Sequence, residues 1–90
     1  MNTPAQSSPD RSELIRFLAS QIATRLDCPV EEVGPDRDLL RLGLQSIDAV
    51  IISGELEDYT KREVDPTLLL SYRTISQIVD AFIELQVDAD

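Results

Sequence analysis

The stretch Leu42-Gly43-Leu44-Gln45-Ser46-Ile47-Asp48-Ala49-Val50 decides how the chain is organised. Its glycine favours a turn, and the apolar residues after the serine have the spacing of a helix. The change from turn to helix falls at Ser46, so we expect this serine in the first position of the helix. A serine at a helix start commonly serves as an N-cap. The free N–H groups and the positive end of the helix dipole would equally favour a phosphate on its hydroxyl, so position alone leaves both interpretations open.

The helix predicted from Ser46 to about Thr60 is apolar on two sides. Its core face is formed by Ala49, Ile52, Leu56 and Tyr59 or Thr60. Its second face is formed by Ile47, Val50, Ile51 and Gly54. Complete burial of a helix is difficult in so small a domain, so we favour contact with a partner.

Acidic residues frame this second face. The helix carries Asp48, Glu55, Glu57 and Asp58 and no base. The candidate docking residues are Leu44, Gln45, Ile47, Asp48, Val50, Ile51, Gly54, Glu57 and Asp58. Such carboxylates are better explained as a solvated frame than as a catalytic acid and base, because perturbed carboxylates need a buried cleft.

Three further helices are expected around an aliphatic core. The first opens at Asp10, which forms a capping box with Glu13, and Cys28-Pro29 ends it. Its apolar stripe is Leu14, Ile15, Leu18, Ala19, Ile22, Ala23 and Leu26. A short helix begins at 64–67 and continues through 68–70, whose leucines would close the core. The last helix is opened by a second capping box, Thr74 with Gln77, and its stripe is Ile75, Ile78, Val79, Phe82 and Leu85.

A long connection from Val30 to Leu44 joins the first two long helices. It should be packed by its own apolar residues, Val33, Leu39, Leu40, Leu42 and Leu44, with 36–38 capping a short turn. The prediction is therefore an all-α fold of three longer helices and a short third one. The expected divisions are a disordered leader at 1–9, one domain at 10–86 and a frayed tail at 87–90.

Composition and charge exclude several classes of function. The 90 residues include 17 acidic and 8 basic side chains, which gives a net charge of −9. Nucleic acid and anionic membranes are thus poor partners, and a basic protein surface is the natural one. With no histidine and one cysteine, Cys28, the chain has no Ser-His or Cys-His pair, no internal disulfide and no metal-ligand spacing. We expect Cys28 to be a small apolar filler, and the chain to be a cytoplasmic monomer without a membrane span.

The stretch 36–47, read as D-R-D-L-L-R-L-G-L-Q-S-I, resembles the phosphopantetheine attachment region of acyl carrier proteins. It is most similar to the carrier domains of polyketide and nonribosomal peptide synthases, whose pattern is L-x-x-L-G-L-D-S-[LI]. The run at 67–75, T-L-L-L-S-Y-R-T-I, resembles the polyketide carrier pattern T-L-L-F-D-Y-P-T. Together with matches at 49–50 and 55–57, the resemblance covers residues 10 to 85 in matching order.

The resemblance implies a four-helix carrier fold in which Ser46 bears 4′-phosphopantetheine. A phosphopantetheinyl transferase would install it from coenzyme A, using magnesium in its own site. Acyl groups would travel as thioesters on the terminal thiol, and the chain would deliver them without catalysing a reaction. Partners would be an acyltransferase, a ketosynthase or an adenylating enzyme, which would dock on the second helix.

Four residues depart from the family pattern. Gln45 replaces the usual aspartate, Arg41 an often acidic residue, Arg73 a proline, and Ile51 a frequent acid on the docking face.

Three hypotheses about function follow. The first is a free-standing carrier in a polyketide or hybrid polyketide and peptide pathway, since the chain begins with methionine. The second is a peptidyl or aryl carrier loaded by an adenylating enzyme, and the third is an unmodified helical adaptor.

Overall fold

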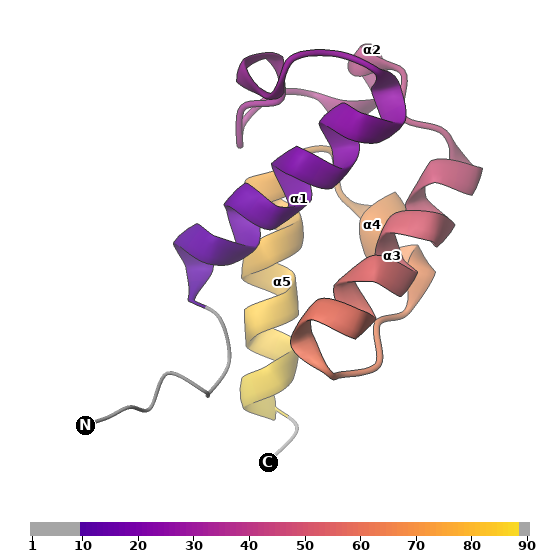
Figure 1. Cartoon of the computed structure of the whole chain (residues 1–90). Coiled ribbons are helices and arrows are strands. Elements are labelled where there is room, and N and C mark those ends of the chain that lie inside the picture. The colour runs from indigo at the N-terminus through magenta and orange to yellow at the C-terminus, as the bar shows by residue number, and fades with distance from the viewer. Residues whose placement is uncertain (1–9, 89–90) are drawn as a thin grey trace.

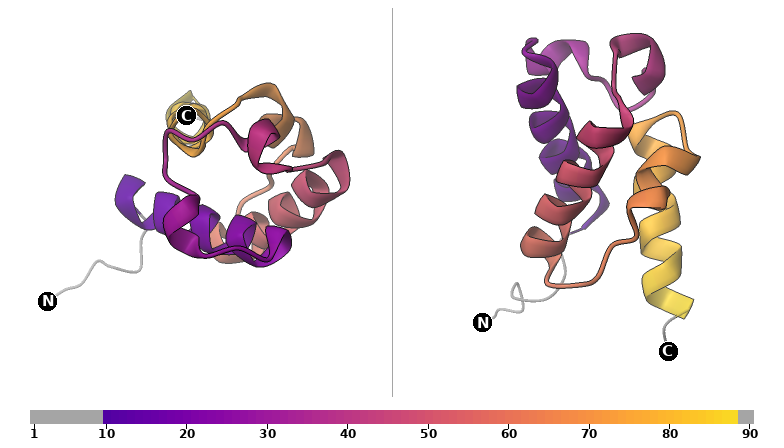
Figure 2. Two further views of the ribbon diagram at one scale, coloured as in Figure 1. Left: turned by 90° about the horizontal axis from the view of Figure 1, so that it is seen from above. Right: turned by 90° about the vertical axis from the view of Figure 1, so that its right-hand side faces the viewer.

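The computed structural model describes residues 10–88, and within them all regular structure is helical (Figure 1). The elements are α1 (Arg11–Leu26), the 3₁₀ helix η2 (Val30–Glu32), α2 (Leu39–Leu42), α3 (Ser46–Thr60), α4 (Pro66–Ser71) and α5 (Ile75–Asp88). Helix α1 packs on α3 and α5, while α4 packs between α3 and α5 on the other side (Figure 2). The all-α prediction is confirmed. Within the long connection, the short turn predicted after 36–38 is present as α2 with Asp38 as its cap, and η2 is an additional turn that was not predicted.

Local capping sets the limits of α1, as predicted. The Asp10 carboxylate accepts from the Glu13 N–H at 2.9 Å, and the Glu13 carboxylate accepts from the Asp10 N–H at 3.2 Å. At the other end, Asp27 adopts a left-handed conformation with φ 58° and donates its N–H to helix carbonyls. Pro29 lies two residues further along the chain, so the helix cannot continue beyond this point.

The long connection is tied to the junction between α4 and α5. The Leu39 N–H donates to the Arg73 carbonyl at 2.8 Å, and the Ser76 N–H donates to the Pro35 carbonyl at 3.0 Å. Asp38 caps α2, accepting from two of its N–H groups, and also pairs with the Arg73 guanidinium at 2.9 Å. This hydrogen bond from Arg73 is the main reason that the pKa of Asp38 is lowered. The arginine that departs from the family pattern thus holds the connection in place.

Apolar residues fill the connection largely as expected. Val33, Leu39 and Leu44 are buried and Leu42 is half-buried, but Leu40 is 59% exposed. The prediction that Leu40 packs inward is wrong, because neighbouring residues of a helical turn point about 100° apart and Leu39 takes the inward position.

The start of α4 agrees with the prediction. Pro66 occupies its first turn, and the Asp65 carboxylate accepts from the Thr67 N–H at 3.0 Å. Two of its three leucines, Leu68 and Leu69, are buried, whereas Leu70 is 49% exposed. The expectation that all three close the core is therefore wrong for Leu70, which a single helical turn directs outward.

Helix α5 differs from the prediction at both ends. The Thr74 hydroxyl accepts from the Gln77 N–H at 3.2 Å, but the Gln77 side chain accepts from Arg73 instead of completing the box. The helix continues to Asp88, so it includes the first two residues of the tail predicted at 87–90. The leader at 1–9, the last two residues and the Leu85 side chain lie outside the described part of the structure.

Aliphatic side chains from all the long helices meet in one core. Each predicted stripe contributes, and Ile75, Ile78, Val79 and Phe82 of α5 are buried as expected. The largest core side chains that are almost fully enclosed are Leu14, Leu18, Ile22, Val33, Leu39, Ile52, Leu56, Leu69, Ile75, Ile78 and Val79. None of the helices in residues 10–88 combines the length and the apolar character needed to cross a bilayer.

Two isoleucines of α3 test this packing. Ile52 is fully buried, and we expect Ile52→Ala to lower the free energy of unfolding by about 2 to 5 kcal/mol because it leaves a cavity. Ile47 is 57% exposed, and Ile47→Ala should change this free energy by about 0.5 kcal/mol or less. Urea unfolding followed by circular dichroism measures both values, and equal losses would contradict the placement of the core.

Candidate functional site

Ser46 is exposed and is the first residue of α3. Its predicted position is confirmed, but the serine is not the cap of the helix: Gln45 is, with an extended backbone. The first hydrogen bond of the helix runs from the Ala49 N–H to the Gln45 carbonyl at 3.0 Å. The ladder of α3 therefore leaves the N–H groups of its first turn available, and the Ser46 hydroxyl lies at the positive end of the helix.

Gly43 makes the turn that brings the chain to Ser46. Its φ of 108° lies in the left-handed region, which L-residues with a side chain rarely adopt. The Gly43 N–H donates to the Leu40 carbonyl at 3.1 Å, and the Leu44 N–H donates to the Leu39 carbonyl at 3.0 Å. These bonds close α2 as a helix C-terminus. Leu44 then enters the core, so the chain is anchored two residues before the serine.

Asp48 joins the start of α3 to the end of α1. One carboxylate oxygen accepts from the Gln45 N–H at 3.0 Å. The other lies 3.2 Å from both Nε and Nη2 of Arg25, in the last turn of α1. The Asp48 side chain is only 11% exposed, so it faces the interior of the helix pair. Sequence reasoning missed Arg25, because its partner lies 23 residues away.

The predicted docking residues divide into two groups. Leu44 and Asp48 are buried, so their assignment to the docking surface is corrected: one packs in the core and the other pairs with Arg25. The half-buried Glu57 also has an internal role, because its carboxylate accepts from the Val64 N–H at 2.8 Å. The remaining predicted residues keep accessible surface, and they are Gln45, Ile47, Val50, Ile51, Gly54 and Asp58.

The predicted two-sided character of α3 agrees with this division. Ala49, Ile52 and Leu56 are buried, while Ile47 and Val50 are 57% and 47% exposed. Exposed apolar side chains also occur on the neighbouring short helices at Leu40 and Leu70, which sequence reasoning assigned to the core. The signal that would have revealed them is the angle of about 100° between consecutive residues of a helix, since consecutive leucines in so short a helix cannot all point inward.

An aromatic pair marks the other end of the contact between α1 and α3. The rings of Phe17 and Tyr59 are stacked, with centroids 4.1 Å apart and planes 5° from parallel. Tyr59 is nevertheless 41% exposed, whereas Thr60, the alternative predicted for this position of the core face, is half-buried. Phe17 covers one face of the Tyr59 ring at the edge of the helix pair.

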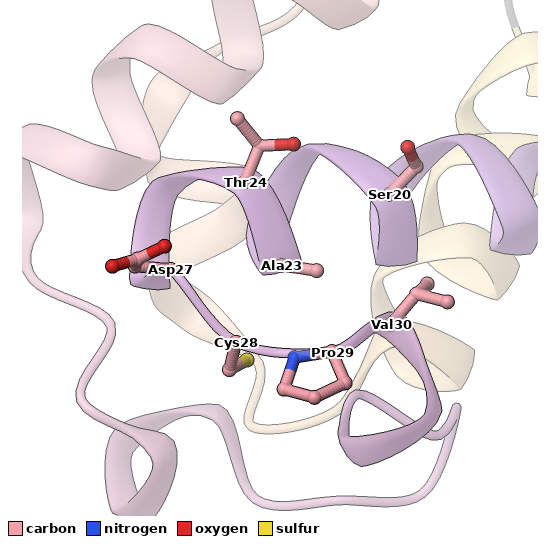
Figure 3. A pocket seen from close by; sticks show the side chains of 7 residues that line it. All are labelled: Ser20, Ala23, Thr24, Asp27, Cys28, Pro29 and Val30. Carbon is pink, nitrogen blue, oxygen red and sulfur yellow. The ribbon is translucent and has the colours of Figure 1, made fainter.

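A hollow of about 620 Å³ lies beside the C-terminal half of α1, and Ser46 is not among the residues that line it (Figure 3). Ser20, Ala23 and Thr24 line it from the helix, and the segment from Asp27 to Val30 lines it from the other side. Cys28 is half-buried there and packs against the core, as expected of a small apolar filler. Among the described residues, no group of His, Cys, Asp and Glu is arranged to hold a metal ion.

Residues 16–82 match the family model described as "Phosphopantetheine attachment site", and the chain belongs to this family of carrier domains. Carrier domains of this family bear a covalently attached 4′-phosphopantetheine. The matched residues include Arg25, Ser46 and Asp48. The resemblance found in the sequence is thereby confirmed.

The curated relatives include synthases and carriers. The chain is 36% identical over 67 residues to a phenolphthiocerol/phthiocerol polyketide synthase of Mycobacterium tuberculosis, a match covering 74% of this chain and 4% of that one. It is 27% identical over 77 residues to an acyl carrier protein of Saccharopolyspora erythraea, covering 84% of this chain and 81% of that one. The chain thus spans a small fraction of the synthase and most of the separate carrier.

Two solved carrier structures share the fold. A free-standing peptidyl carrier protein from an Acinetobacter baumannii secondary metabolic pathway superimposes with a TM-score of 0.78 at 32% identity, covering 86% of this chain and 96% of that one. BlmI, a type-II acyl carrier protein from Streptomyces verticillus involved in bleomycin biosynthesis, gives a TM-score of 0.76 at 30% identity. Its match covers 84% of this chain and 89% of that one.

Two glycines near the site should respond to alanine in opposite directions. Neither has an atom within 4 Å of an added Cβ, so backbone conformation decides the outcome. Gly43→Ala should lower the free energy of unfolding by about 1 to 3 kcal/mol, because its φ is left-handed. Gly54→Ala, inside α3, should raise it by about 0.5 to 1 kcal/mol. Thermal unfolding compares the two, and a change of the same sign in both would contradict the Gly43 turn.

Proposed function

We propose that Ser46 is the attachment point of 4′-phosphopantetheine and that the chain carries acyl intermediates as thioesters in polyketide or hybrid polyketide and peptide biosynthesis. The observation that carries the proposal is the exposed Ser46 hydroxyl at the start of α3, within the matched family range. The chain serves partner enzymes as a substrate and supplies no catalytic group. We further propose that it acts as a separate carrier, which the extensive match to separate carriers supports.

The residues around Ser46 fit a phosphate ester. The first-turn N–H groups of α3 and its dipole favour negative charge at this place. The nearby carboxylate of Asp48 is turned inward and paired with Arg25, so it does not oppose a phosphate with an uncompensated charge. When attached, the group supplies a terminal thiol that forms thioesters. The chain's own residues hold the serine outward and keep the backbone donors beside it.

The attachment reaction needs little from the chain besides this hydroxyl. A bond forms between Ser46 Oγ and the phosphorus of the pantetheine arm, while the pyrophosphate bond of coenzyme A breaks. Adenosine 3′,5′-bisphosphate leaves, and the hydroxyl proton passes to a base. The phosphopantetheinyl transferase provides that base and the magnesium ion.

Coexpression with a permissive phosphopantetheinyl transferase tests the attachment. Intact mass spectrometry should show one phosphopantetheinyl group on the wild type and none on Ser46→Ala. Ser20→Ala, which removes an exposed serine of α1, is the matched control and should be modified like the wild type. An unmodified wild type would favour the helical adaptor, and modification of Ser46→Ala would move the site.

We propose that partner enzymes dock on the exposed side of α3 beside Ser46. This docking face consists of Gln45, Ile47, Val50, Ile51, Gly54 and Asp58. It combines exposed apolar side chains with one acid in a chain of net charge −9, which suits a partner with an apolar centre and a basic rim. Such partners are the transferase and an acyltransferase, ketosynthase or adenylating enzyme. The cytoplasm remains the predicted location.

Two equally exposed valines provide a sharp test of this face. Val50 and Val30 are both 47% exposed, but Val30 lies on η2. We expect Val50→Asp to raise the transferase KM for the carrier about tenfold, because a charge enters the apolar centre of the contact. Val30→Asp should leave it within about twofold of wild type. Equal effects of both substitutions would contradict docking at α3.

A peptidyl or aryl carrier is the second candidate. The likeness to a solved peptidyl carrier protein at 32% identity favours it. Loading of the modified chain by adenylating enzymes with amino or aryl acids would support this candidate, and transfer by acyltransferases from acyl coenzyme A would support the first. Mass spectrometry of the thioester distinguishes the two outcomes.

A further inference from the structure

The contact between Arg25 and Asp48 links the end of α1 to the residue preceding Ser46. Both guanidinium contacts, Nε and Nη2, fall on the same Asp48 oxygen at 3.2 Å. The second oxygen remains for the Gln45 N–H at 3.0 Å. One carboxylate therefore connects the last turn of α1 with the cap residue of α3.

Burial distinguishes this ion pair from the others in the described residues. The Arg25 and Asp48 side chains are 35% and 11% exposed, whereas those of the Arg11–Asp80 pair are 50% and 61% exposed. Solvent and salt screen a partly enclosed pair less than an exposed one. Removing one partner also leaves the other charge uncompensated in the helix contact.

We propose that Arg25 and Asp48 are positioning residues for phosphopantetheine attachment at Ser46, an inference that rests on the proposed function. Asp48 accepts a hydrogen bond from the Gln45 N–H and thereby fixes the direction of the backbone at the start of α3. Arg25 pairs with Asp48 and thereby fixes this direction relative to α1. The Ser46 hydroxyl is presented to the transferase in one orientation because of these two contacts.

The pair also has an electrostatic role. Asp48 is the acidic residue in the first turn of α3 and lies two positions after Ser46. Arg25 compensates the charge of Asp48. The phosphates of coenzyme A therefore approach an N-terminus of α3 that carries no net negative charge. Loss of Arg25 alone should therefore be more harmful than loss of both charges together.

Steady-state kinetics of phosphopantetheine addition to the full chain test the proposal. Arg25→Gln should lower the transferase kcat about tenfold, because displaced reacting groups slow the chemical step, while KM for the carrier stays within about twofold. The double variant Arg25→Gln with Asp48→Asn should recover part of kcat, since its asparagine oxygen still accepts from Gln45. Arg25→Lys, which retains a charge but lacks the planar fork, should fall between the wild type and Arg25→Gln.

Arg11→Gln is the matched control, because it breaks the exposed ion pair on the same helix. Its kcat and KM should equal those of the wild type. Circular dichroism at the assay temperature verifies folding, and if Arg25→Gln is unfolded, Arg25→Lys and Asp48→Asn carry the test.

Two outcomes would overturn the inference in distinguishable ways. If the folded Arg25 and Asp48 variants keep kcat within about twofold of the wild type, the positioning role is wrong and the attachment at Ser46 stands. A rise in KM with unchanged kcat would likewise refute positioning, because it indicates a docking role. If the wild type itself accepts no phosphopantetheine, the proposed function fails, and the positioning role fails with it.

Discussion

The inward carboxylate of Asp48 is the constraint on which the start of α3 depends. It accepts from the backbone of Gln45 on one side and from Arg25 of α1 on the other. A buried carboxylate is tolerated only with such partners. Helices α1 and α3 must therefore pack so that Arg25 lies against Asp48. The stacked rings of Phe17 and Tyr59 hold the opposite end of the same contact. Ser46 thus begins a helix whose orientation is set at both ends.

A second set of contacts holds the segment that leads to the serine. Arg73 binds the Asp38 side chain through its guanidinium and the Leu39 N–H through its carbonyl. Its position follows α4, so the connection between α1 and α3 is tied to the far side of the bundle. The Gly43 turn and the buried Leu44 then direct the chain to Ser46. Ser46 is thereby exposed while its neighbours on either side are anchored.

One apolar side of α3 stabilises the fold, and the other is accessible for contact with another protein. Ala49, Ile52 and Leu56 bury one side in the core, while Ile47 and Val50 leave the other accessible. An accessible apolar surface adds nothing to the stability of the isolated domain, and it suits contact with another protein. Its position beside Ser46 is consistent with a carrier that must present one residue to several enzymes.

The sequence by itself determined the four expected helices and the position of Ser46, because the signals for these are local. Capping residues, Pro29, Pro66 and the Gly43 turn act within a few residues, and the helix from Ser46 to Thr60 was predicted with its observed limits. The family motif likewise lies within a continuous stretch. Only the tertiary structure decided the roles of Asp48 and Arg73, whose partners lie 23 and 35 residues away. From the sequence alone, a charged residue two positions after an exposed serine is expected on the surface. In the folded chain Arg25 of α1 pairs with Asp48, so this carboxylate is turned inward.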